Sequence, residues 1–249
     1  CVNYTDETRQ KMRELGAVPV DYKLSRAGMN PFADLLTIWQ LRKLFKQLKP
    51  DVVLSCFVKP SIYGSIAANL AGVPKKIAML EGLGFVFTDL PTGITFKQKL
   101  LRKIQVFLYR LALPSIDKLV FLNPDDPVDL LEKNKLQAKQ VEVLGGIGLD
   151  LELFPYSEVT TEVPRFIFIA RLLAEKGIFE YIEAAELVKE KHPEAEFVVL
   201  GGIDEANPGG LKQADLQKLI DLGVIIYPGY VIKVHEWIAD SSVFVLPSY

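Results

Sequence analysis

The sequence is poor in the residues that build disulfide and metal sites. Of its 249 residues only two are cysteine, Cys1 and Cys56, and only two are histidine, His192 and His235. Two cysteines exclude a disulfide scaffold, and this usage is typical of a reducing compartment. The histidines lie far apart, and neither begins a spacing that binds zinc or iron. We therefore predict no protein-bound metal.

Long apolar runs and an excess of charge are also missing. No run approaches the ~18 residues that span a bilayer, and residues 1–13 lack the apolar stretch of a signal peptide. The formal net charge is -2, which gives no sign of a nucleic-acid partner. The first residue is not methionine, and the last residues, 244–249, read as a strand entering a loop. We expect the natural chain to continue at both ends.

What is present is an alternation of short apolar runs and stretches with helical spacing. The runs predicted to be strands are 51–57, 76–80, 118–122, 140–144, 165–170, 196–200, 224–227 and 243–246. The predicted helices are 34–48, 61–71, 96–113, 177–191, 215–222 and 234–241. Apolar runs separated by helices predict parallel sheets buried on both faces. The polar segment 156–164 divides the pattern, so we predict two domains, residues 1–157 and 158–249.

The strongest candidate site follows the first strand of the second half. In a doubly wound sheet, ligands bind outside the carboxyl ends of the strands. Arg171 and Lys176 lie there, in a segment that opens a helix. Two cations beside a helix N-terminus suit a diphosphate, and they would stabilise charge on a departing nucleoside diphosphate. The spacing alone equally permits a solvated loop in which Glu175 pairs locally.

The segment 170–177 resembles the R-x(4)-K-G signature of family 4, group 1 glycosyltransferases. These enzymes have the GT-B fold, an α/β architecture of two Rossmann-like doubly wound parallel-sheet domains facing a cleft. Further segments resemble the bacterial branch that builds capsule, O-antigen and N-acetylgalactosamine-containing precursors. They are residues 25–31, 58–64, 81–87, 122–126 and 145–150. The similarity runs from about Ser25 to Tyr249, so it covers nearly the whole chain, with both domains incomplete.

The resemblance implies an enzyme that moves a hexose or N-acetylhexosamine from a UDP-sugar to a polyprenyl-diphosphate-linked saccharide. It also implies that anomeric configuration is retained and that no cofactor is needed. The enzyme would act as a peripheral protein at the cytoplasmic face of the inner membrane. Arg171 and Lys176 match the residues that hold the donor diphosphate, and we expect Gly146 near that phosphate. A tight strand-exit turn would also explain Gly146. The family's first glycine-rich loop and its E-G-x-P segment are missing from this sequence, so we expect weak donor binding or none.

The acceptor side is less clearly marked. The candidates share positions after strands or in the matching segments, and they are Arg26, Lys59, Glu81, Gly82 and Gly84. Glu81 stands near the place where many relatives have a histidine, so we predict no histidine-based role. Glu81 also suits a solvated loop, and Lys59 a surface position before a helix. The acidic pair Asp125 and Asp126 is interpreted as a helix N-cap, not as a metal site.

The predicted helix 96–113 is amphipathic. Its basic residues are Lys99, Arg102, Lys103 and Arg110. Its apolar residues, which a helical wheel places opposite them, are Leu100, Leu101, Ile104, Phe107, Leu108, Leu111 and Ala112. This pattern is typical of a helix in an anionic membrane surface, which would suit a lipid-linked acceptor. A helix packed on the sheet with a solvated basic face is the alternative.

Two other functions fit the same architecture. A UDP-sugar 2-epimerase would need acid and base carboxylates together with histidines, and histidine is nearly absent. A non-catalytic two-lobed sugar-binding module would need an export signal. A dinucleotide-dependent dehydrogenase is disfavoured because no G-x-G-x-x-G follows a strand.

Overall fold

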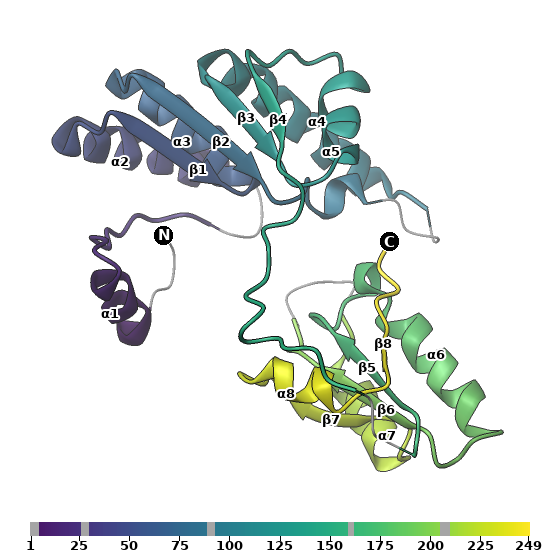
Figure 1. The fold of residues 1–249 in the computed structure, drawn as a ribbon. Helices are drawn as coiled ribbons and strands as arrows, with labels where there is room; N and C mark the ends of the chain where they lie inside the picture. Colours follow the sequence, from purple (N-terminus) through teal and green to yellow (C-terminus); the bar gives the residue numbers. More distant parts are fainter. Residues whose placement is uncertain (1–4, 26–29, 89–92, 159–161, 205–209) are drawn as a thin grey trace. The chain divides into compact units, whose positions relative to one another are not determined.

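The chain divides into two units, each built on its own parallel sheet (Figure 1). The computed structural model describes residues 5–25, 30–88, 93–158, 162–204 and 210–249. The first unit takes residues 1–87 and 94–147, and the second takes 88–93 and 148–249. The division after Ile147 precedes the boundary expected from composition. Between the two boundaries, the ring of Phe154 packs edge-on against His235 of the second unit.

The first unit contains a four-stranded sheet with the strand order β1-β2-β3-β4. Its strands are β1 (Val52–Cys56), β2 (Lys75–Leu80), β3 (Lys118–Phe121) and β4 (Val141–Val143). Its helices are α1 (Asp6–Glu14), α2 (Pro31–Leu48), α3 (Val58–Ala71), α4 (Phe96–Ala112) and α5 (Asp125–Pro127), with a π-helical turn at Val128–Glu132 and 3-10 turns at Phe85–Phe87 and Leu113–Ser115.

Local sequence signals explain where these helices begin and end. Asn30 caps α2, accepting hydrogen bonds from two backbone N–H groups, and Pro31 fills the first helical position. Thr95 caps α4 in the same way. Gly72 ends α3 in the left-handed conformation that glycine adopts readily. The side chain of Asn123, rather than the acidic pair that follows it, caps α5: its Oδ1 accepts from the N–H groups of Asp125 and Asp126.

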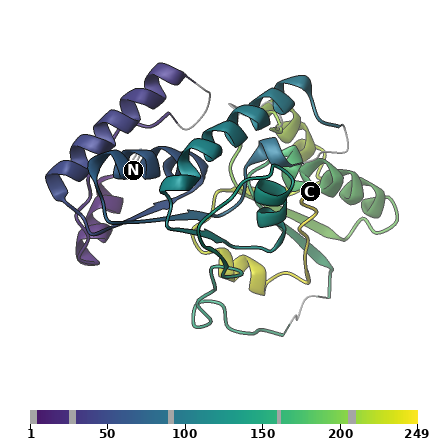
Figure 2. The same cartoon turned by 90° about the horizontal axis from the view of Figure 1, so that it is seen from above.

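Helices cover only one face of the first sheet in the described part of the chain. Right-handed crossovers that always advance in one direction leave every helix on the same side. Figure 2 shows α2, α3 and α4 along one side of the strands. Val53 is buried on that side, whereas Val52 and Leu54 on the other are more than half exposed. The predicted burial of both faces is therefore wrong for β1, whereas β3 is buried on both faces at Leu119, Val120 and Phe121.

The second unit has the strand order β7-β6-β5-β8. Its strands are β5 (Arg165–Ile169), β6 (Glu196–Leu200), β7 (Ile226–Gly229) and β8 (Val243–Phe244). Its helices are α6 (Ile178–Lys189), α7 (Gln213–Asp221) and α8 (Val234–Ala239), and a 3-10 turn, Ala174–Lys176, precedes α6.

The second sheet is doubly wound. Strands β5, β6 and β7 advance in one direction, and the chain then returns past β5 to form β8. This reversal puts α8 on the opposite face from α6. Phe168 belongs to the core that includes Tyr181 of α6, whereas Ile167 belongs to the core that Trp237 of α8 packs against. The strand order thus reverses between β5 and β8, which is where ligands bind in open α/β sheets.

The eight strands fall within two residues of their predicted positions. Helix α1 was not predicted, because it has no buried residue and therefore no apolar periodicity to reveal it.

Candidate functional site

The loops that follow β5 and β6 form one joined surface at the carboxyl edge of the second sheet. The N–H of Leu172 donates to the carbonyl of Gly202 (3.2 Å), and the N–H of Leu211 donates to the carbonyl of Leu172 (2.9 Å). Gly201 has φ +140°, and a Cβ there would lie 1.8 Å from the carbonyl oxygen of Ala170. Only glycine allows the two loops to approach this closely.

The segment after β8 packs against the same turn. A Cβ on Gly177 would lie 2.1 Å from the carbonyl oxygen of Pro247. The backbone N–H of Tyr249 donates to the carbonyl of Glu175 (3.3 Å), and its hydroxyl donates to Oε1 of Glu180 (2.5 Å). The loops after β5, β6 and β8 therefore converge on the turn that opens α6.

Arg171 and Lys176 occupy this convergence. Nη1 of Arg171 lies 3.0 Å from Oδ2 of Asp204, and the arginine side chain is 61% exposed. Lys176 is half-buried, and no carboxylate of the described residues forms an ion pair with it. The local pairing with Glu175 allowed by the sequence is not among the ion pairs of the described residues. Asp204 was missed by the sequence analysis, although a polar loop directly after a buried strand could have indicated it.

The arrangement is suited to an anion. Gly177 is the N-cap residue of α6 and no side chain caps the helix, so the first backbone N–H groups of α6 have no partner within the helix. With Arg171 and Lys176 nearby, the turn offers two cations and the positive end of the helix dipole. A diphosphate needs donors of this kind on several oxygens.

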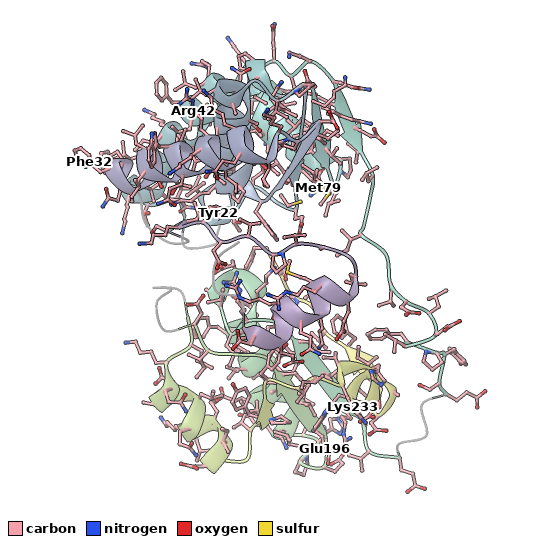
Figure 3. The ribbon with its side chains drawn as sticks, turned by 90° about the vertical axis from the view of Figure 1, so that its left-hand side faces the viewer. Tyr22, Phe32, Arg42, Met79, Glu196 and Lys233 are labelled. Carbon is pink, nitrogen blue, oxygen red and sulfur yellow. The ribbon has the colours of Figure 1, made fainter. Side chains whose placement is uncertain are left out.

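In the first unit, the ends of β1 and β2 lie side by side. Cys56 pairs with Met79 in the parallel register (Met79 is labelled in Figure 3), and the next turn begins at Glu81. Glu81 is exposed. Gly82 and Gly84, with φ of +135° and +81°, use the backbone freedom of glycine.

Two further interactions involve the ends of these strands. Burial raises the pKa of the Cys56 thiol, and the negative charge of Glu81 raises it further. The side chain of Gln105 on α4 donates to the carbonyl of Leu83 (3.0 Å) and anchors the loop after β2.

Lys59 is more enclosed than either interpretation of the sequence expected. Its side chain is 19% exposed, and its Nζ lies 3.5 Å from Oδ1 of Asp34. Nζ also donates to the carbonyl of Ser25 (2.8 Å). Burial, and then the hydrogen bond with Asp34, raise the pKa of Tyr63 in the same cluster. A ligand phosphate would have to compete with these partners, so the acceptor role of Lys59 stays a prediction.

Two other predicted residues are not brought to a site. Arg26 lies outside the described residues. Gly146 belongs to the first unit and is exposed after β4, and a Cβ there would meet no atom within 4 Å. Its place near the donor phosphate stays a prediction.

The apolar arc of α4 is only partly buried. The helix buries Gln98, Tyr109 and Ala112, so part of the apolar arc turns outward beside the basic residues. The exposed fractions of Phe96, Leu100, Phe107 and Leu111 are 84%, 48%, 56% and 55%. Phe96, Leu100 and Phe107 share an open groove of about 520 Å³ with basic side chains and Asn134. Its lining is Phe96, Lys99, Leu100, Arg102, Lys103, Val106, Phe107, Arg110 and Asn134.

The four basic residues of α4 differ in their contacts. The guanidinium of Arg102 lies 4.5 Å from the ring centroid of Phe87. Arg110 donates to the carbonyl of Asn134 (3.4 Å). Lys99 and Lys103 are exposed. Arg102 therefore holds the loop after β2, and the other three face outward.

Within the described ranges, no helix combines the length and the apolar character that crossing a bilayer requires. Nor do three or more histidine, cysteine, aspartate or glutamate side chains gather there as metal ligands would.

Each unit matches a glycosyltransferase family model of its own. Residues 7–123 match the model described as glycosyl transferase 4-like, and residues 163–249 match the model described as glycosyl transferases group 1.

Two curated relatives act on lipid-linked sugars. The chain is 32% identical over 257 residues to the N,N'-diacetylbacillosaminyl-diphospho-undecaprenol alpha-1,3-N-acetylgalactosaminyltransferase of Campylobacter jejuni, covering 98% of this chain and 65% of the relative. It is 27% identical over 231 residues to the UDP-Gal:alpha-D-GlcNAc-diphosphoundecaprenol alpha-1,3-galactosyltransferase of Escherichia coli, covering 86% of this chain and 56% of the relative. The chain thus spans less than two thirds of the length of either relative.

Solved structures share the fold at low identity. Anabaena Alr3699/HepE in complex with UDP and glucose superposes with a TM-score of 0.68 at 13% identity, over 98% of this chain and 65% of that one. Sucrose-phosphate synthase from Thermosynechococcus elongatus superposes with a TM-score of 0.68 at 15% identity, over 88% of this chain and 55% of that one.

Proposed function

The chain belongs to the family 4, group 1 glycosyltransferases of the GT-B fold, and we propose that the full-length protein transfers a hexose or N-acetylhexosamine. The donor is a UDP-sugar, and the acceptor is a saccharide linked to polyprenyl diphosphate. The reaction belongs to the synthesis of a surface polysaccharide or glycan. The relatives named above act on undecaprenyl-diphosphate-linked sugars, which supports this substrate class.

One observation supports the proposal above all: Arg171 and Lys176 both follow β5, where the strand order of the second sheet reverses. Breaking the bond between the anomeric carbon and the diphosphate leaves an electron pair, and hence negative charge, on a phosphate oxygen. Cations held in place before the reaction stabilise that charge without reorganisation. Arg171 offers a planar fork of donors, and Lys176 a compact charge.

The acceptor hydroxyl attacks the anomeric carbon on the face from which the diphosphate leaves. Its proton passes to the departing phosphate oxygen, so anomeric configuration is retained and no separate protein base is needed. Arg171 and Lys176 keep that oxygen close to the attacking hydroxyl. We expect the reaction to proceed without a protein-bound metal, because the two cations supply the positive charge.

We further propose that α4 rests on the cytoplasmic face of the inner membrane. Exposed aromatic and aliphatic side chains beside Lys99, Lys103 and Arg110 suit the boundary between acyl chains and anionic headgroups. A lipid-linked acceptor would be met at that surface.

The test is transfer of labelled sugar by the full-length protein. Labelled UDP-sugars are mixed with a polyprenyl-diphosphate-linked N-acetylhexosamine, and label is counted in the lipid extract alongside released UDP. Label in lipid that disappears in Lys176→Ala and persists in Lys218→Ala, an exposed lysine of α7, supports the proposal. Interconversion of the donor sugar without an acceptor would instead identify an epimerase and overturn it.

A further inference from the structure

Phe57 is the single residue between the end of β1 and the start of α3. Its backbone has φ +69° and ψ 168°, and for a bulky residue a positive φ is a rare and strained conformation. Its side chain is nevertheless 58% exposed. An aromatic ring therefore stands at the carboxyl edge of the first sheet on a backbone that would suit glycine better.

The surrounding packing imposes this conformation. The N–H of Phe57 donates to the carbonyl of Met79 (3.0 Å), and its carbonyl accepts from the N–H of Ser61 (3.0 Å). The hydroxyl of Ser61 also donates to the carbonyl of Ser55 (3.1 Å). A Cβ on Gly64 would lie 2.6 Å from Oγ of Ser55, so α3 packs closely on β1. Any residue at position 57 must adopt the strained backbone.

Folding stability gives no reason for a phenylalanine at this position. Glycine would adopt this backbone conformation at no steric cost. A ring that stays more than half exposed to water contributes little to stability through burial. Strained residues persist most often where a side chain has a task at a binding site. The ring projects from a strand end, which is the edge where open α/β sheets bind ligands.

The neighbouring residues indicate the chemistry of the ligand. Glu81 follows β2, whose Met79 receives the hydrogen bond of Phe57, and its charge reaches Cys56 next to Phe57. Gly82 presents bare backbone beside it. A flat apolar surface and a carboxylate acceptor at the ends of two adjoining strands match a sugar ring, which has an apolar C–H face and a rim of hydroxyl donors.

We propose that Phe57 is a platform for a sugar ring of the acceptor, and that the carboxylate of Glu81 accepts hydrogen bonds from that sugar's hydroxyls. The inference rests on the proposed transferase function, and it assigns the acceptor's sugar to this edge of the first sheet. Phe57 then determines acceptor affinity and takes no part in donor binding.

The experiment measures KM for acceptor and donor separately in the full-length protein. Phe57→Gly keeps the fold, with an unchanged or raised melting temperature, because glycine relieves the strain. Its acceptor KM rises at least about tenfold, as expected for loss of a stacking surface, while donor KM stays within about twofold. Phe57→Trp keeps the platform and an acceptor KM near that of the wild type. The matched control is Phe32→Ala, which replaces an exposed phenylalanine at the start of α2 (labelled in Figure 3).

Saturation-transfer NMR tests the contact without catalysis. With the polyprenyl-diphosphate-linked N-acetylhexosamine as the probe, the wild type transfers saturation to the C–H protons of the sugar, and Phe57→Gly does not. An unchanged acceptor KM and unchanged saturation transfer in Phe57→Gly would overturn the platform while transfer by the wild type still stood. A wild type that binds the probe through Phe57 but transfers no sugar would instead overturn the proposed reaction.

Discussion

The guanidinium of Arg171 and the carboxylate of Asp204 form an ion pair, with Nη1 and Oδ2 3.0 Å apart. One residue follows β5 and the other follows β6. The pair therefore joins the two loops at the proposed donor site. It also places a negative charge beside the cation that would bind a diphosphate.

Asp204 should compete with the donor for Arg171. Replacing it with asparagine keeps the size of the side chain and removes the competing charge. We expect Asp204→Asn in the full-length protein to bind UDP about three- to tenfold more tightly by calorimetry. Asp215→Asn, an exposed position on α7, is the control. Weaker UDP binding in Asp204→Asn would mean that the carboxylate orients the guanidinium instead.

Removing Arg171 should slow transfer far more than it destabilises the fold. We expect Arg171→Ala to lower kcat/KM by about 10²–10³-fold, the range for loss of one preorganised electrostatic group. The control is Arg165→Ala, which removes an arginine paired with Glu196 at the amino end of the same strand. Equal losses of activity in both variants would argue against a role for Arg171 in the reaction.

Gly201 should tolerate no side chain. Its φ of +140° and the 1.8 Å approach to the carbonyl of Ala170 predict that Gly201→Ala lowers the free energy of unfolding by about 2–4 kcal/mol. Gly202→Ala is the matched control, because a Cβ there meets no atom within 4 Å. Denaturant unfolding monitored by circular dichroism measures both. Equal stability of the two variants would show that the loops relax easily.

Membrane binding by α4 should depend on both kinds of exposed side chain. Replacing Lys99, Lys103 and Arg110 together with alanine should weaken sedimentation with phosphatidylglycerol vesicles about a hundredfold, at ~1 kcal/mol for each cation. Phe107→Ser should also weaken binding, and this loss should persist at high salt. Lys218→Ala on α7 is the control.

Arg102 should behave differently from its three basic neighbours. Because its guanidinium lies over the ring of Phe87, Arg102→Ala should lower the melting temperature and leave vesicle binding almost unchanged. A large loss of vesicle binding with unchanged stability would contradict this division of roles.

Asp117 should make the first unit sensitive to acid. The backbone N–H of Lys76, and then Lys139, hold the pKa of Asp117 down at about 2. A depressed carboxylate pKa stabilises the fold above the unfolded-state value of about 4, and the contribution is lost as the pH falls from about 4 to 2. Asp117→Asn should be less stable at neutral pH and lose less stability over that window. Parallel acid-unfolding curves for variant and wild type would refute this.

The sequence alone determined the order of the strands and of most helices, and it indicated the principal candidate site. Apolar runs such as 118–122 and 196–200 are local signals. The strands predicted from them therefore lie within two residues of the observed strands. The position of Arg171 and Lys176 after one of those runs needed no knowledge of the rest of the fold. Parallel strands align their carboxyl ends, and the site follows from that rule.

Only the tertiary structure decided the relations that join distant segments. The sequence could not show that Asp204 meets Arg171, because the two are separated by a helix and a strand. Nor could it show which arc of α4 is buried, since the neighbouring elements choose that face. The strain at Phe57 arises from the close packing of α3 on β1. Each of these depends on packing between elements, which a pattern along the chain does not record.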